Sequence, residues 1–221
     1  MNSPAYLVIR VHPDTQDGVD EYFRLIATVA NYKGGIEVGS ALATNVEIFE
    51  PGSIPFATLI IKWPEGEQSA IVFWNCIEHQ SIFRRIKFKD NIIAFVAQGL
   101  PEEGLPNDPT PTIASYAPNT FTDNKNEVCL IIDGVILKTE IIDKYREILF
   151  EIMIEKKSYY TVITLTEGIN LLHGTWKEDI FAISKWPSMK NIHEFWYSDK
   201  YQNEGIPLRT GAGKFSVIAF N

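Results

Sequence analysis

The sequence predicts an α+β protein built from two copies of one β-α-β-β-α-β unit, and three observations support this fold class. Short runs rich in Val and Ile alternate with segments of helical spacing, in the same order in each half. A stretch with five prolines between the halves is typical of an extended, semi-rigid connector. A Trp-Pro motif followed by Phe-Trp occurs twice although the chain has only five Trp, at residues 63–64 with 73–74 and at residues 186–187 with 195–196. We therefore expect a first repeat at 1–98, the connector at 99–126 and a second repeat at 127–221.

The first repeat is predicted to begin with a strand at residues 5–11, where Val and Ile predominate. A helix at 17–32 follows, because apolar residues recur there at helical spacing and a Gly-Gly pair stops it. Residues 35–49 alternate like one long strand, which Pro51-Gly52 ends in a turn. The repeat closes with a strand, a helix and a strand, at residues 56–62, 64–81 and 91–97.

The second repeat is predicted to have the same six elements, at residues 128–133, 139–156, 159–165, 179–185, 188–201 and 214–220. An offset of 122 residues places the first strand over its counterpart, with residues 6–9 above 128–131. In that alignment Ile132 and Gly134 correspond to Arg10 and His12, so polar character would belong to the first repeat alone.

The element order favours a ferredoxin-like arrangement, in which both helices cover one face of a four-stranded antiparallel sheet. The other face of each sheet would carry apolar side chains that water cannot cover at low cost. We therefore expect the two sheets to face each other as an intramolecular, pseudo-dimeric α/β barrel.

Charge and composition exclude several classes of function. The net charge of −8 is spread along the chain, which argues against a nucleic-acid-binding surface. The two cysteines and four scattered histidines lack the spacing of a disulfide framework or a metal site, and no cofactor is implied. No signal peptide and no apolar run long enough for a membrane span is evident, so we expect a cytoplasmic protein.

The second repeat resembles the domain-of-unknown-function 1330 family of the dimeric α/β-barrel superfamily. The resemblance rests on four motifs, namely Trp186-Pro187-Ser188, Phe195-Trp196, a Ser-x-x-Tyr-Gln run at 198–202, and Leu208-Arg209. The first repeat keeps Glu50-Pro51-Gly52 but has His79-Gln80 where the family has Tyr-Gln, and Lys87 where it has Arg.

This resemblance implies that Glu50, Tyr201 and Arg209 contact a ligand and that His79 takes the place of a cleft tyrosine. Superfamily members include cofactor-independent monooxygenases, isomerases, polyketide cyclases and simple binding proteins, so the fold does not select a reaction.

Strand alternation places Tyr6, Arg10 and His12 on the face between the sheets, where Glu37 could pair with Arg10. Such a polar end to an apolar cavity could hold an anionic or carbonyl-bearing ligand, or it could be an ordinary surface ion pair. Trp74 is either a stacking surface for a planar ligand or part of the core.

If the protein is an enzyme, acid–base chemistry by His79, His12 or Glu37, with Arg10 holding an oxyanion, is the predicted arrangement. The predicted function is binding of a small apolar or aromatic metabolite, with cofactor-independent catalysis left open. The alternative is a non-catalytic structural or interaction module whose barrel is filled with side chains. Either a monomer or a homodimer is compatible with the sequence.

Overall fold

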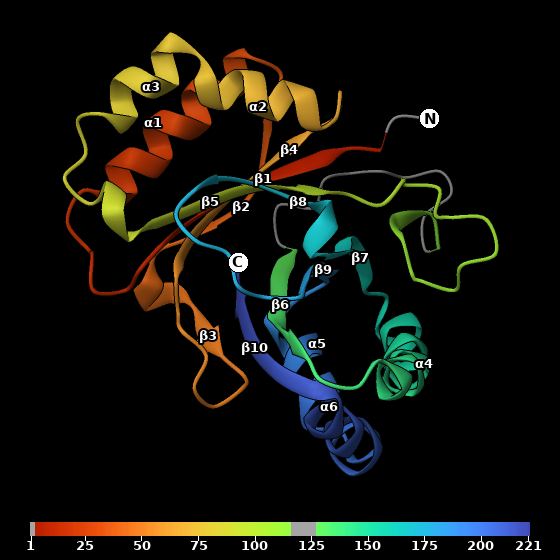
Figure 1. The fold of residues 1–221 in the computed structure, drawn as a ribbon. Helices are drawn as coiled ribbons and strands as arrows, with labels where there is room; N and C mark the ends of the chain where they lie inside the picture. Colours follow the sequence, from red (N-terminus) through yellow and green to blue (C-terminus); the bar gives the residue numbers. More distant parts are fainter. Residues whose placement is uncertain (1–2, 116–126) are drawn as a thin grey trace.

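The computed structural model describes residues 3–115 and 127–221 and contains two five-stranded antiparallel sheets (Figure 1). The strand order is β2-β4-β1-β5-β8 in the first sheet and β3-β10-β6-β9-β7 in the second. The strands span β1 Ala5–Val11, β2 Ile36–Ala41, β3 Glu47–Ile48, β4 Ala57–Trp63, β5 Ile92–Gln98, β6 Val128–Ile136, β7 Tyr159–Leu165, β8 Ile169–His173, β9 Ile180–Trp186 and β10 Gly213–Phe220.

Helices cover the outer face of each sheet (Figure 1). Those on the first sheet are α1 Val19–Tyr32, α2 Glu67–Asn75 and α3 Ile77–Phe83, and those on the second are α4 Thr139–Lys156, α5 Met189–Trp196 and α6 Ile206–Ala212. Short 3-10 turns lie at η1 Ala43–Asn45, η2 Lys89–Asn91, η3 Ile113–Ser115 and η4 Thr166–Gly168, and a π-helical turn lies at η5 Tyr201–Gly205. Within the described parts of the chain, none of the helices is both long and apolar enough to cross a bilayer.

Three apolar clusters stabilise this layered arrangement. One lies between α1–α3 and the first sheet, and a second lies between α4–α6 and the second sheet. The third lies between the two sheets, where the side chains of Tyr6, Val8 and Phe95 meet those of Phe181 and Phe220. All five are almost fully buried, so side chains fill the space between the sheets.

Each sheet takes its fifth strand from the other half of the chain. β3 leaves the first half and pairs with β10, and β8 leaves the second half and pairs with β5. The predicted single strand at 35–49 is therefore wrong: β2 ends at Ala41, and the chain crosses to the other sheet before Glu47. An alternating pattern predicts extended backbone but does not identify the neighbouring strand.

The pairing register repeats with an offset of 123 residues. Ala5 pairs with Trp63 as Val128 pairs with Trp186, and both shifts equal 123 (128 − 5 and 186 − 63). The bulge between Glu37 and Gly39 also recurs, 123 residues later, between Tyr160 and Val162. The predicted offset of 122 for the first strand is wrong. Because side chains alternate along a strand, this one-residue error assigns every residue of the matching strand in the second half to the wrong face of the sheet.

The second helix of each half is shorter than predicted. The helix expected at 64–81 is interrupted at Cys76, whose backbone is extended and whose Sγ accepts from the His79 amide. The helix expected at 188–201 ends at Trp196, and the π-helical turn with α6 follows it.

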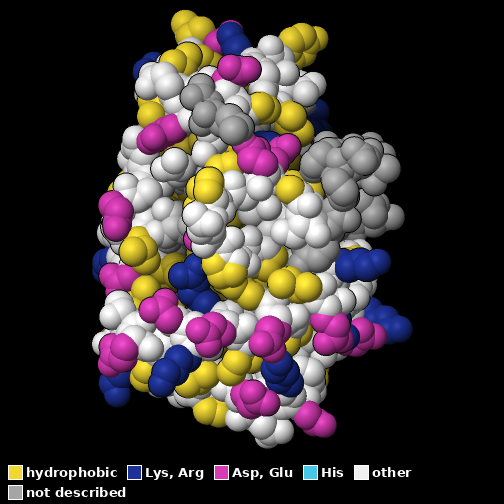
Figure 2. Space-filling model, turned by 90° about the vertical axis from the view of Figure 1, so that its right-hand side faces the viewer, with side chains coloured by type: hydrophobic (Ala, Val, Ile, Leu, Met, Phe, Trp, Pro, Cys, Tyr) yellow, Lys and Arg dark blue, Asp and Glu magenta, His cyan; other side chains and the backbone are white. Residues whose placement is uncertain are grey.

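The described part of the proline-rich connector packs against the second sheet. The Leu100 amide donates to the Thr161 carbonyl, and the Tyr160 amide donates to the Pro111 carbonyl, so residues 99–115 cover the edge strand β7. Residues 116–126 of the predicted connector lie outside the described residues. On the side of the molecule where the connector and α4 lie, most visible acidic and basic side chains occupy the lower half of the surface (Figure 2).

Candidate functional site

Arg10 points into the space between the sheets, but its partner is not the predicted one. Its Nη2 atom lies 2.6 Å from Oδ2 of Asp133, and both residues are buried. The guanidinium is also 5.4 Å from the ring centroid of Phe56 and 5.5 Å from that of Phe181. Because Asp133 lies 123 residues after Arg10, this ion pair joins two positions that are equivalent in the repeated register.

The residues predicted to act with Arg10 lie in different surroundings. Glu37 is exposed and accepts a hydrogen bond from Ser40, so the expected Arg10–Glu37 pair is wrong. His12 is half-buried at the end of β1, where its Nδ1 lies 3.2 Å from Asp14 Oδ2. His79 lies in the helix-side core of the first half. The predicted catalytic arrangement is therefore not assembled, and Tyr6 and Trp74 are buried in two different apolar clusters.

The structure brings three predicted ligand contacts together, with Glu50 from the first half and Tyr201 and Arg209 from the second. Arg209 is buried, donates to Glu50 and stacks over Trp196, with its guanidinium 4.7 Å from the ring centroid. Tyr201 packs beside the same indole, and its hydroxyl lies 3.1 Å from that of Tyr145, on α4. Burial raises the pKa of both tyrosines, so the hydroxyls stay protonated at neutral pH.

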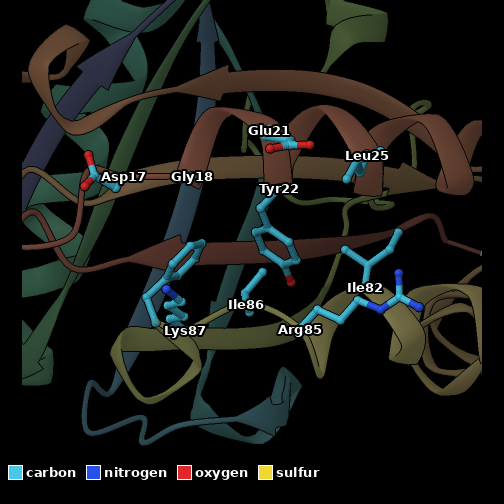
Figure 3. Close-up of a pocket in the computed structure, with 10 residues that line it drawn as sticks. Asp17, Gly18, Glu21, Tyr22, Leu25, Ile82, Arg85, Ile86 and Lys87 are labelled. Carbon is cyan, nitrogen blue, oxygen red and sulfur yellow. The ribbon is translucent and has the colours of Figure 1, made fainter.

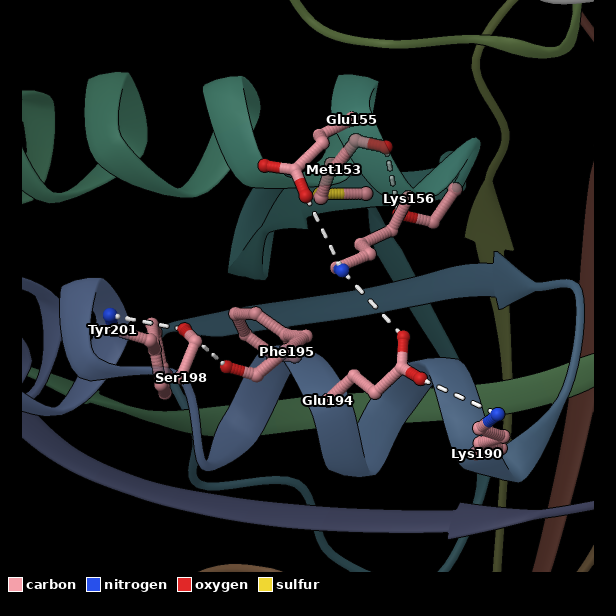
Figure 4. Close-up of polar contacts among 9 residues, drawn as sticks. Met153, Glu155, Lys156, Lys190, Glu194, Phe195, Ser198 and Tyr201 are labelled. Atoms are coloured by element: carbon pink, nitrogen blue, oxygen red, sulfur yellow. Dashed lines mark hydrogen bonds and ion pairs between the residues drawn. The ribbon is translucent and has the colours of Figure 1, made fainter.

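Short local contacts fix the position of Tyr201. Ser198 donates to the Phe195 carbonyl at 2.8 Å and accepts from the Tyr201 amide at 3.2 Å (Figure 4). Lys156 of α4 lies 3.5 Å from Glu194 of α5, which joins the two helices on either side of this contact (Figure 4). The sequence signal for Tyr201 is the Ser-x-x-Tyr-Gln run, whereas Tyr145 was not predicted as a site residue.

The first half contains a cavity of about 480 Å³ between α1 and residues 82–88, which we call the α1 pocket. The residues that line it are Asp17, Gly18, Glu21, Tyr22, Leu25, Ile82, Arg85, Ile86, Lys87 and Phe88. Figure 3 shows Tyr22 directed from α1 toward Ile86 and Arg85. None of the nine predicted site residues is among those that line it, and only Lys87 lies in a family motif.

His79 lies on α3, the helix that contributes Ile82 to this pocket, and is fully buried. Its ring is enclosed by Phe73, Trp74 and Phe83, with centroids 4.3 to 5.8 Å away. Nδ1 lies 2.6 Å from the Trp74 carbonyl oxygen, which can only accept, so Nδ1 carries the proton and Nε2 is a bare acceptor. Burial lowers the pKa of His79 to about 4, so the ring is neutral at physiological pH.

Tyr22 and His79 occupy the places that Tyr145 and Tyr201 hold in the second half. Tyr145 follows Tyr22 by 123 residues (145 − 22), and Tyr201 follows His79 by 122 (201 − 79). Gln80 and Gln202 confirm the second correspondence, since each amide donates to a Trp carbonyl, at 2.7 Å and 2.5 Å. Within residues 3–115 and 127–221, however, neither Tyr22 Oη nor His79 Nε2 has a hydrogen-bond partner, although both atoms are buried.

The described residues contain no group of three or more His, Cys, Asp or Glu side chains placed to hold a metal ion.

Solved structures share this fold along the whole chain. A proposed monooxygenase from Lactobacillus acidophilus NCFM is 9% identical with a TM-score of 0.52, over 100% of this chain and 94% of that one. A variant chlorite dismutase from Candidatus Nitrospira defluvii is 7% identical with a TM-score of 0.50, over 100% and 93%. An anthrone oxidase-like protein is 8% identical with a TM-score of 0.50, over 99% and 91%.

At these identities the similarity shows the fold alone, an α+β fold with two antiparallel five-stranded sheets that is consistent with a dimeric α+β barrel-like arrangement. No protein-family model and no curated protein sequence matches the chain.

Proposed function

We propose that this protein binds a small molecule with an apolar or aromatic body in the α1 pocket. The observation that carries the proposal is the cavity of about 480 Å³, which is within the range of roughly 300–1,000 Å³ typical of ligand sites. Its apolar surface comes from Tyr22, Leu25, Ile82, Ile86 and Phe88. The fold shared with proteins described as monooxygenases and oxidase-like proteins is compatible with such a role.

Charged side chains around the opening would orient the ligand. Asp17 and Glu21 belong to the α1 side, and Arg85 and Lys87 belong to the opposite wall (Figure 3). A few charged groups around an apolar body are the usual means by which a pocket fixes ligand orientation. We propose no catalytic role for His12, Glu37 or Arg10, because they have separate partners, and turnover stays a prediction.

The test is native mass spectrometry after incubation with a small-molecule extract. We expect wild-type protein to retain a ligand mass that the Leu25→Trp variant loses, because an indole at position 25 fills the pocket. Ile148→Trp is the matched control, since Ile148 is the half-buried counterpart of Leu25 on α4 (148 − 25 = 123). A mass retained equally by Leu25→Trp would place the ligand elsewhere.

A second candidate function is the non-catalytic structural or interaction module. The observation that favours it is the side-chain-filled space between the sheets, where Val8, Phe95 and Phe181 are fully buried. If wild-type protein at about 10 μM retains no mass, any affinity is weaker than micromolar and this candidate becomes the better one.

We also infer that the chain is a tandem duplication, with repeats at 1–98 and 127–221 joined by 99–126, related to the domain-of-unknown-function 1330 family. The repeated register, the repeated bulge and the reciprocal fifth strands support this inference. The apolar cluster between the two sheets supports the proposal that they form a pseudo-dimeric barrel.

A further inference from the structure

Tyr22 Oη and His79 Nε2, which we call the Tyr22–His79 pair, are complementary. The phenol of Tyr22 is a donor, and the bare Nε2 of His79 is an acceptor. Leaving either group buried without a partner costs free energy, so native proteins seldom do so without a reason. The pair therefore indicates that another group completes the hydrogen bonds.

The second half shows how the same two positions are satisfied without a ligand. There Tyr145 and Tyr201 place their hydroxyls 3.1 Å apart. Replacing the second tyrosine by a histidine shortens the side chain by about one hydroxyl group, because imidazole ends at its ring whereas phenol carries an oxygen beyond it. In the first half, His79 supplies no hydroxyl at the position where the protein itself supplies one in the second half.

The pair is placed to meet a molecule in the α1 pocket. Tyr22 lines the pocket directly. Ile82, which also lines it, follows His79 by three residues on α3, so the two side chains lie on the same side of that helix. The ion pair of Lys33 and Glu78, at 2.8 Å, ties the end of α1 to the start of α3 and holds the two elements together.

Resting on the binding function proposed above, we propose that the Tyr22–His79 pair holds a hydroxyl group of the bound molecule, so that the ligands are phenols or apolar alcohols. The ligand oxygen accepts from Tyr22, and the ligand O–H donates to Nε2 of His79. A hydroxyl satisfies both members, because it donates and accepts at once. A carboxylate would set its lone pairs against those of Nε2, and a protonated amine, which has no lone pair, would leave the Tyr22 proton without an acceptor.

The experiment compares 1-naphthol with 1-methylnaphthalene, which has a methyl group in place of the hydroxyl, by calorimetric titration of the whole chain. We expect wild-type protein to bind 1-naphthol about tenfold more tightly, which is the size of effect that buried hydrogen bonds give. Tyr22→Phe removes the donor, and His79→Tyr supplies the protein's own hydroxyl. Both variants should bind the two probes equally, whereas Tyr145→Phe in the second half should keep the preference.

A second measurement detects the contact itself. In protein labelled with ¹⁵N at histidine, 1-naphthol should shift the Nε2 resonance of His79, and 1-methylnaphthalene should leave it in place. This separates a ligand hydroxyl from a bound water molecule, which would give the same resonance with both probes.

The outcomes distinguish the two proposals. If wild-type protein binds both probes equally and Leu25→Trp binds neither, the α1 pocket is the binding site but the proposal that it selects hydroxyl-bearing ligands is overturned. Binding of neither probe at millimolar concentration would overturn the pocket as a site for apolar molecules.

Discussion

Two tyrosines at equivalent positions should respond in opposite ways to loss of the hydroxyl. Tyr145→Phe leaves the buried Tyr201 hydroxyl without its partner, so we expect the free energy of unfolding to fall by about 1 kcal/mol. Tyr22→Phe removes a hydroxyl that is unpaired among the described residues, so it should be neutral or stabilising. Urea denaturation of the two variants checks this, and an equal loss in both would contradict the assignment of Tyr22 as an unpaired donor.

His79 should make stability depend on pH. Its pKa is about 4 in the folded protein against an ordinary 6.5, because burial disfavours the charged ring. Between these values the unfolded chain takes up a proton that the folded chain does not, so stability falls as pH falls from about 6.5 toward 4. The size of this component is on the order of 3 kcal/mol over the whole range.

The His79→Tyr variant should lack this component while keeping the rest of the acid profile. Denaturation at a series of pH values measures the difference between the two proteins. Parallel profiles for wild type and variant would mean that His79 is protonated without penalty.

For single residues, the sequence predicted the direction of a side chain better than the residue that it contacts. Alternation along β1 correctly placed Arg10 between the sheets, because side-chain direction is a local property of a strand. Its partner Asp133 was missed, because the one-residue error in the offset made Ile132, instead of Asp133, the counterpart of Arg10 in the second half. The same error hid the correspondence of Tyr22 with Tyr145, which holds at an offset of 123 and not at 122, and neither tyrosine was predicted as a site residue.

At the scale of elements, periodicity predicted nearly every strand and the first helix of each half. β3 and β8 were not recognised as separate strands, because a two- or five-residue strand has too short a pattern to show its own beginning. The breaks after α2 and α5 were also missed, since Cys76 and Ser198 interrupt the helices through amide contacts that the apolar spacing does not reveal. The α1 pocket forms where α3 gives way to residues 84–88, a segment for which no helix or strand was predicted.

At the scale of the whole molecule, the Arg10–Asp133 pair should select how the halves associate. Asp133→Arg places two buried cations together, and we expect a loss of about 3–5 kcal/mol in the free energy of unfolding. The double variant Arg10→Asp with Asp133→Arg restores opposite charges at the same two positions and should recover most of that loss. Chemical denaturation of the three proteins checks the prediction, and a double variant no more stable than the single one would contradict it.

The same charges disfavour pairing of like halves. Two first halves would bring Arg10 against Arg10, and two second halves would bring Asp133 against Asp133, whereas the mixed pair is neutral. A mixed association is therefore preferred whichever chains supply the halves.

Reciprocal exchange of β3 and β8 has a consequence for concentrated solutions. A first half and a second half taken from different chains can form the same strand pairs as two halves of one chain. The interface is the same in both assemblies, so the balance between the single chain and the exchanged dimer depends on the effective concentration that the connector imposes. In dilute solution each half pairs with the other half of its own chain. As the protein concentration approaches the effective concentration, exchanged dimers with the same interior become equally favourable.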